Sequence, residues 1–115
     1  MVRKPSANPG REAGAEEALY SILDTFLRHA PERVATLATA VASGSDVDVA
    51  KAAHVFRGAA ATIGARELAE LLERVETTAR AGELERAREF FEQVSPVAHN
   101  VIEYLRQQRA AMAEA

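Results

Sequence analysis

The chain has 115 residues, enough for one domain and too few for separate nucleotide-binding and substrate-binding domains. Apolar residues make up 48% of it and aromatic residues only 5%, and its 25 alanines favour helices. A net charge of -3 with both signs interspersed argues against binding to nucleic acid or to an anionic membrane. The lack of cysteine excludes disulfides, thiol catalysis and thiolate metal sites. No signal peptide or membrane-spanning segment is indicated, so we expect a cytoplasmic protein.

The N-terminal segment 1–14 contains two prolines, two glycines and few apolar side chains, and we expect a flexible leader there before a helical domain at 15–115. A helix is predicted over 15–30, where apolar residues recur at spacings of three and four. Its inward stripe is expected to consist of Ala15, Leu19, Ile22 and Phe26. Pro31 is expected to end that helix and to begin a second one over 31–43, because proline disfavours helical geometry at the residue before it.

Three further helices are predicted at 45–63, at 66–80 and from residue 84 onward, separated by turns at glycines. Ser45 or Asp46 is expected to cap the first of them. Pro96 interrupts the last one, and the sequence leaves open whether it kinks the helix or starts a new segment. Short connections make successive helices antiparallel. The predicted fold is therefore all-α, an up-and-down four-helix bundle with an additional N-terminal helix packed across one end.

The helix at 45–63 is the candidate for function, because its pattern departs from that of a plain bundle helix. At about 100° per residue, His54 lies opposite the apolar residues that must face the core, and it therefore points to solvent. Gly58 lies one turn further along the same face, although glycine inside a helix costs about 0.5–1 kcal/mol relative to alanine. The missing side chain predicts that another protein approaches the imidazole closely.

An exposed imidazole with a cation three residues away is suited to carrying a phosphoryl group. A neutral imidazole is a nucleophile near neutral pH, and Arg57 would steady the phosphoryl oxygens around His54. The sequence has no Walker motif, no G-x-G-x-x-G and no carboxylate cluster for Mg²⁺. We therefore expect no ATP site and no cofactor, and a relay rather than a kinase. Three widely separated histidines predict no metal site.

Residues 53–65, AHVFRGAAATIGA, resemble the signature of histidine-containing phosphotransfer (HPt) domains, commonly A-H-x-L-K-G followed by small residues and a final G-A. A looser likeness runs from 19 to 105. The resemblance implies a four-helix bundle in which His54 takes a phosphoryl group from the aspartate of a response-regulator receiver domain and passes it to another receiver. It also implies that Arg57 replaces the usual lysine, that Gly58 provides clearance, and that the receiver holds Mg²⁺.

The surface expected to meet the receiver surrounds the histidine and is small, as suits a transient complex. It is predicted to consist of Val47, Ala50, Gly58 and Ala61, with Lys51 and Arg57 at its rim. Glu76 and Arg80 occupy positions where many HPt domains have glutamate and a basic residue. Their spacing of four is typical of a surface ion pair, and we also keep Arg80 as a residue that contacts the partner.

We expect a monomeric phosphorelay intermediate, either free-standing or part of a hybrid sensor histidine kinase. Two alternatives remain open. One is the phosphate-accepting domain of a chemotaxis-type kinase, which has a similar motif but receives its phosphate from an ATP-binding domain. The other is a bundle that docks onto a receiver without phosphotransfer. A dimerising kinase core is disfavoured, because Val55 stands where such cores have glutamate after the histidine.

Overall fold

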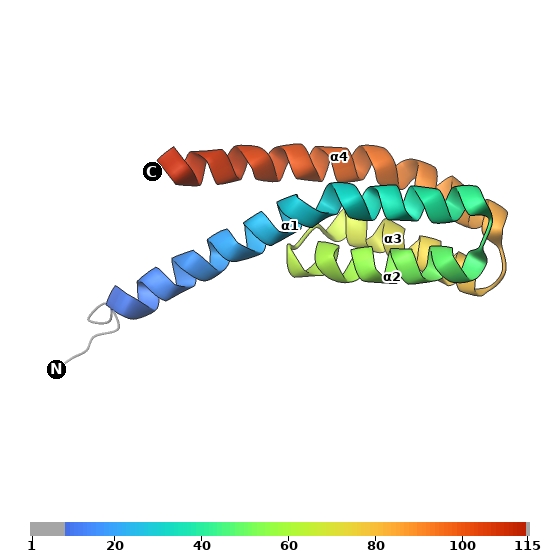
Figure 1. Cartoon of the computed structure of the whole chain (residues 1–115), viewed down its shortest axis with the longest axis horizontal. Coiled ribbons are helices and arrows are strands. Elements are labelled where there is room, and N and C mark those ends of the chain that lie inside the picture. The colour runs from blue at the N-terminus through green and yellow to red at the C-terminus, as the bar shows by residue number, and fades with distance from the viewer. Residues whose placement is uncertain (1–8, 115) are drawn as a thin grey trace.

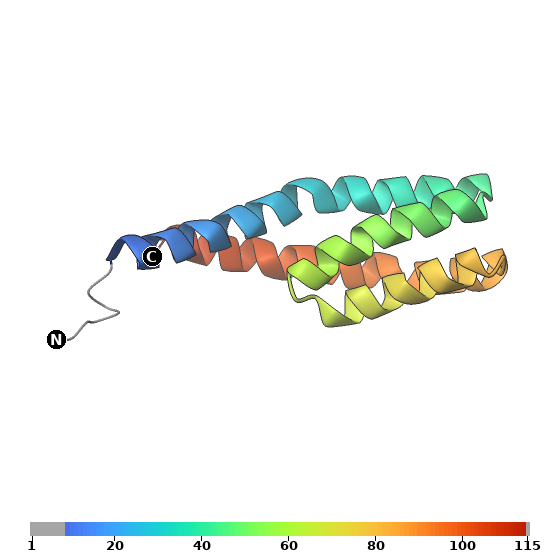
Figure 2. The ribbon, with the colours of Figure 1, turned by 90° about the horizontal axis from the view of Figure 1, so that it is seen from below.

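The computed structural model describes residues 9–114, which fold into four helices. They are α1 (Pro9–Ser43), α2 (Asp46–Thr62), α3 (Arg66–Arg80) and α4 (Leu84–Glu114). The described part of the chain contains no strand, so the all-α class is confirmed. Figures 1 and 2 show an elongated bundle whose successive helices run in opposite directions. Within residues 9–114, no helix combines the length and apolar character needed to cross a membrane.

The additional N-terminal helix predicted from the sequence is wrong, because α1 is one continuous helix of 35 residues with Pro31 inside it. An interior proline removes a backbone hydrogen bond and costs about 3 kcal/mol. Core packing on both sides offsets this cost, since Ala30 and Leu37 are almost fully buried. Proline therefore bends the helix here instead of ending it. Figure 1 shows the change of direction about midway along α1.

Pro96 also lies within a continuous helix, because α4 runs unbroken through it for 31 residues. The structure thus decides the question that the sequence left open, and Pro96 does not start a new segment. The proline itself is exposed, whereas Val94 and Ala98 on either side of it are buried. The apolar stripe of α4 therefore continues past the proline, and the contacts of this stripe hold the helix together.

Helix α1 begins at Pro9, inside the segment expected to be a leader, while residues 1–8 lie outside the described residues. The inward stripe predicted for its first half is wrong, because Leu19 and Ile22 are 49% and 41% exposed. Figures 1 and 2 show the reason: α1 and α4 extend beyond the shorter α2 and α3, so these two helices cannot cover that part of α1. Phe26, further along the stripe, is buried in the core.

Each connection between helices contains a glycine in the left-handed conformation, as the sequence predicts. The φ angles of Gly44, Gly64 and Gly82 are 76°, 79° and 77°, a region that glycine enters at little cost. Ser45 caps α2, because its hydroxyl oxygen accepts a hydrogen bond of 3.2 Å from the backbone N–H of Asp48. These short connections place α2 and α3 side by side in opposite directions.

One core, to which all four helices contribute, fixes the rotation of α2 about its axis. The apolar residues of α3 that recur at spacings of three and four are all buried: Leu68, Leu71, Leu72, Val75 and Ala79. On α2, Phe56 is completely buried. Burial of one large apolar side chain contributes about 1.5–3 kcal/mol. The face of α2 opposite Phe56 is therefore held toward solvent.

Polar contacts join the far ends of α1 and α4. The carboxylate of Asp24 accepts hydrogen bonds from the guanidinium of Arg109, the shorter of them 2.7 Å long. The same guanidinium lies 4.7 Å from the centre of the Tyr20 ring, and the Tyr20 hydroxyl donates to the backbone oxygen of Met112 at 3.3 Å. These contacts hold the two helices together where the core no longer connects them.

Candidate functional site

His54 lies on the exposed face of α2, as the helical spacing predicts. Its side chain is 57% exposed, whereas Ala53 and Phe56 on the inner face are completely buried. The imidazole is therefore accessible to another protein while its backbone belongs to a rigid part of the bundle. Among residues 9–114, the only hydrogen-bond contacts of this imidazole are made through Nδ1.

A buried carboxylate on α3 contacts the imidazole. Oε2 of Glu76 lies 3.0 Å from Nδ1 of His54, although the two residues are 22 positions apart in the chain. Glu76 is only 7% exposed. The packing of α3 along α2 brings the two side chains together. With Nδ1 engaged in this way, Nε2 is the ring nitrogen left to react.

Two arginines complete the cluster around Glu76. The Nε of Arg57 donates to Oε1 at 3.0 Å, and Arg80 donates to Oε2 from Nε at 3.0 Å and from Nη2 at 2.7 Å. Nη2 of Arg57 also lies 3.2 Å from Nδ1 of His54. One carboxylate thus joins an imidazole and two guanidinium groups from two helices.

These partners keep the carboxylate charged. Burial by itself raises the pKa of Glu76, but hydrogen bonds from Arg80, His54 and Arg57 outweigh it and hold the pKa below its ordinary value. Glu76 is therefore ionised at neutral pH. A buried charge with satisfied hydrogen bonds fixes the orientation of the groups around it, which here include the imidazole.

The ion pair between Glu76 and Arg80 that their spacing predicts does form. It is not a surface pair, however, because Glu76 is buried and also binds His54 and Arg57. Sequence reasoning noted that Glu76 matches a glutamate common in HPt domains but did not place it beside His54. A further signal was available: Glu76 follows Leu72 by four residues and precedes Ala79 by three, so it lies on the apolar stripe of α3. A carboxylate on such a stripe needs partners from elsewhere in the fold.

Gly58 leaves open space beside the histidine. A Cβ atom built at this glycine would meet no heavy atom within 4 Å, so packing inside the described chain does not require glycine here. Lys51 and Ala61 are exposed on the same side of α2, and Val47 is 64% exposed. The structure thus places these predicted contact residues on one accessible surface around His54.

Ala50 does not belong to that surface. It is only 5% exposed and is part of the core, which corrects its assignment to the exposed patch. Ala50 lies one turn before His54, on the edge of the buried face that continues to Ala53. Because the alanine side chain is small, the neighbouring part of the bundle approaches closely enough to cover it.

Comparison with known protein families identifies the chain. The family model described as Hpt domain matches residues 21–114, which is most of the chain. The chain belongs to the Hpt domain family. It is therefore a histidine phosphotransfer intermediate of a phosphorelay, as the motif around His54 predicts.

A solved structure similar to this Hpt domain is that of histidine-containing phosphotransfer protein B from Pseudomonas aeruginosa PAO1. The two chains are 29% identical, the TM-score is 0.80, and the match covers 94% of each chain. The comparison with curated proteins finds no match. The structural likeness therefore extends over nearly the whole bundle and agrees with the family assignment.

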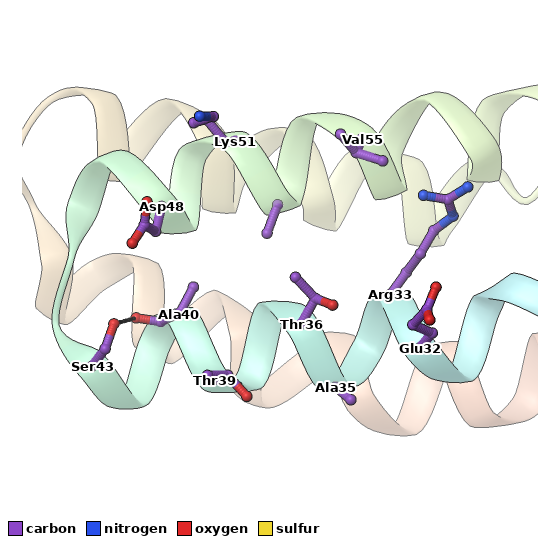
Figure 3. A pocket seen from close by; sticks show the side chains of 11 residues that line it. Glu32, Arg33, Ala35, Thr36, Thr39, Ala40, Ser43, Asp48, Lys51 and Val55 are labelled. Carbon is purple, nitrogen blue, oxygen red and sulfur yellow. Dashed lines mark hydrogen bonds between the residues drawn. The ribbon is translucent and has the colours of Figure 1, made fainter.

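A groove between α1 and α2 of the Hpt domain adjoins the histidine. Its volume is about 760 Å³, and small side chains such as Thr36 and Ala52 form much of its lining. Figure 3 shows the side chain of Arg33 extending from α1 toward α2, with Lys51 and Val55 on the opposite rim. Because Val55 directly follows His54, the groove and the imidazole lie on neighbouring parts of one surface.

Proposed function

We propose that His54 is the residue of this Hpt domain that takes a phosphoryl group from the aspartate of one receiver domain and passes it to the aspartate of another. The observation that supports this proposal is the state of the imidazole: it is exposed, and Glu76 holds it through Nδ1. Nε2 is then the nitrogen with an available lone pair, which is what nucleophilic attack requires.

The two transfers are displacements at phosphorus. In the first, the lone pair of Nε2 attacks the phosphorus of the phosphoaspartate, a P–N bond forms, and the P–O bond breaks to release the carboxylate. In the second, a carboxylate oxygen of the next receiver attacks, and the electrons of the P–N bond return to Nε2. Catalysis of such steps rests on positioning and on stabilisation of charge rather than on further covalent chemistry.

The residues around the histidine have distinct proposed roles. Arg57 and Lys51 are cations that contact phosphoryl oxygens or acidic groups of the receiver. Gly58, Ala61 and Val47 form the exposed surface on which the receiver docks, and the absent side chain of Gly58 lets it come close. Arg80 is exposed on the neighbouring helix and contacts the partner while it also binds Glu76.

The partners in this proposal are receiver domains, including that of a hybrid sensor kinase, and the protein is a cytoplasmic monomer. It binds neither ATP nor nucleic acid. Among residues 9–114, no group of three or more histidine or carboxylate side chains is arranged to hold a metal ion. Mg²⁺ is accordingly proposed to be a ligand of the receiver, whose own phosphorylation site supplies the second half of the reaction centre.

The site of phosphorylation can be tested with matched histidine variants. Receiver domains charged with acetyl phosphate are mixed with the wild type, with His54→Gln and with His99→Gln, which changes another exposed histidine. We expect acid-labile phosphate on the wild type and on His99→Gln, and none on His54→Gln. Equal labelling of His54→Gln would disprove the proposal. Labelling that requires a kinase domain with ATP, and that no receiver gives, would favour the chemotaxis-type alternative.

A further inference from the structure

Arg33 on α1 lies at the junction of two hollows on the surface beside the histidine. It lines the groove between α1 and α2, and Figure 3 shows its side chain extending from α1 toward α2. The same arginine lines a second hollow of about 290 Å³ further along the two helices, beside Ala59 and Thr62. The two hollows are therefore neighbouring parts of one surface, with a guanidinium group where they meet.

The guanidinium of Arg33 has no acidic partner within residues 9–114, where it forms neither a hydrogen bond nor an ion pair. Its acidic neighbour in the chain, Glu32, lies instead 4.0 Å from Nδ1 of His29. The two arginines beside the reactive histidine differ from it, because the Glu76 carboxylate binds both of them. Arg33 thus offers a complete set of donors to another molecule, in the planar arrangement that matches a carboxylate.

A receiver whose aspartate reaches Nε2 of His54 must also cover the groove. Protein–protein interfaces of this kind bury roughly 600–800 Å² on each partner, a patch about 30 Å across. The axes of two packed helices are only about 8–10 Å apart. Val55, the residue after His54, lies on one rim of the groove, and Arg33 extends from the other. The groove therefore lies within the area that the receiver covers.

We propose that Arg33 is a specificity-determining residue, which binds a carboxylate of the receiver outside the receiver's own phosphorylation site. This proposal rests on the proposed function, because the receiver is the partner that brings an aspartate to His54. A receiver that places an aspartate or glutamate over the groove is accepted. A receiver with lysine or arginine at the same place is repelled, and such repulsion is how surface charges discriminate between partners of the same fold.

Selection by Arg33 is separate from the chemistry at the histidine. No hydrogen bond or ion pair joins Arg33 to the cluster around Glu76. The small side chains that line the groove, such as Thr36 and Ala52, leave room for a receiver side chain to reach the guanidinium. A change at Arg33 is therefore expected to alter the affinity for the receiver, while the rate of transfer at saturation stays the same.

Binding can be measured apart from phosphotransfer. Receivers encoded in the same genome are charged with beryllium fluoride, which imitates phosphoaspartate without transferring a phosphoryl group, and titrated into wild type, Arg33→Glu and Arg28→Glu. The control changes an exposed arginine of α1 that lines neither hollow. We expect about tenfold weaker binding by Arg33→Glu and little change in Arg28→Glu. The unfolding free energy of Arg33→Gln should equal that of the wild type, because the guanidinium forms no bond within the described chain.

A compensating change in the partner identifies the contact. Exposed aspartates and glutamates of the receiver that binds the wild type most tightly are changed to lysine one at a time. One such receiver variant is expected to restore binding to Arg33→Glu and to weaken binding to the wild type. The same receiver variant is expected not to restore binding to Lys51→Glu, which alters the opposite rim of the groove.

The outcomes separate this proposal from the proposed function. Equal affinities of Arg33→Glu and Arg28→Glu would overturn the specificity role, and so would a receiver scan in which no carboxylate restores binding. Receivers that bind through Arg33 without placing phosphate on His54 would contradict the proposed function and leave the contact with Arg33 standing. If no charged receiver binds the wild type, both proposals fail.

Discussion

The imidazole of His54 and the carboxylate of Glu76 are in direct contact across two helices, with 3.0 Å between Nδ1 and Oε2. This contact depends on the whole bundle, because the buried Phe56 sets the rotation of α2 and the apolar stripe of α3 sets the position of Glu76. The site is therefore built from a rigid core, one exposed imidazole and one buried charge that orients it.

Replacement of Gly58 by alanine is expected to raise the stability of the protein and to lower its rate of phosphotransfer. The added methyl group meets no atom in the free protein, so the free energy of unfolding is expected to rise by about 0.5–1 kcal/mol. In the complex the same methyl group meets the receiver, and the phosphotransfer rate is expected to fall at least about tenfold. Urea unfolding and transfer kinetics measure the two effects.

The matched control for this prediction is Gly14→Ala, which makes the same change at an exposed position in the first half of α1, where an added Cβ would also meet no atom within 4 Å. This variant is expected to gain stability and to keep its transfer rate. If Gly58→Ala transfers as fast as the wild type, the open space at Gly58 is not needed for docking.

Glu76 is expected to make stability depend on pH in the acidic range. Its pKa is held below the ordinary value of 4.5, so its ionised form stabilises the folded state above that pH, and this contribution disappears as the pH falls through the lowered value. At neutral pH, Glu76→Gln is expected to lose about 1–3 kcal/mol of unfolding free energy. The difference between the two proteins should shrink steadily in acid. A difference that stays constant down to acid unfolding would show that charge is not the cause.

Lys51 is expected to attract the receiver without taking part in the chemistry. Charge reversal in Lys51→Glu places a negative charge beside a partner whose phosphorylation site is acidic, so the concentration of receiver needed for half-maximal rate should rise about tenfold. The rate at saturation should change little, and added salt should reduce the difference. Arg66→Glu makes the same charge change at the start of α3 and should resemble the wild type. A similar loss in both variants would point to net charge instead of local contact.

The contact between Asp24 and Arg109 is expected to hold the first half of α1 against α4. The hydrogen bonds from Arg109 hold the pKa of Asp24 below its ordinary value, so acid weakens the contact only once the pH falls through that lowered value. Asp24→Asn should therefore speed amide hydrogen exchange in the first half of α1 and leave α2, α3 and the transfer rate unchanged. Slower transfer in this variant would connect the far end of the bundle to the site, contrary to this account.

Helical periodicity was enough to predict where helices lie, where glycines end them and that His54 is exposed, because these features depend on residues close in sequence. Pro31 shows the limit of local reasoning. Its effect on the chain depends on whether Ala30 and Leu37 both reach the core, and their burial is a property of the folded bundle. The same tertiary contacts turn two predicted helices into one.

The candidate site also combines features that depend on residues close in sequence with features that depend on contacts between helices. The motif around His54 predicts the reactive residue and the open space at Gly58, since both are on one helix. The role of Glu76 could not be predicted from its spacing to Arg80, because its main partner, His54, is 22 residues away. Ala50 also shows that position on a helical wheel does not decide burial near the edge of the apolar face, where the neighbouring elements do.

The most direct test of the account is a complete relay through the wild-type chain. The protein is phosphorylated by one charged receiver, purified, and mixed with a second, unphosphorylated receiver and Mg²⁺. Phosphate should leave His54 and appear in equal amount on the aspartate of the second receiver, much faster than hydrolysis alone. Loss of phosphate at the same rate with and without the second receiver would contradict the claim that His54 is a relay intermediate.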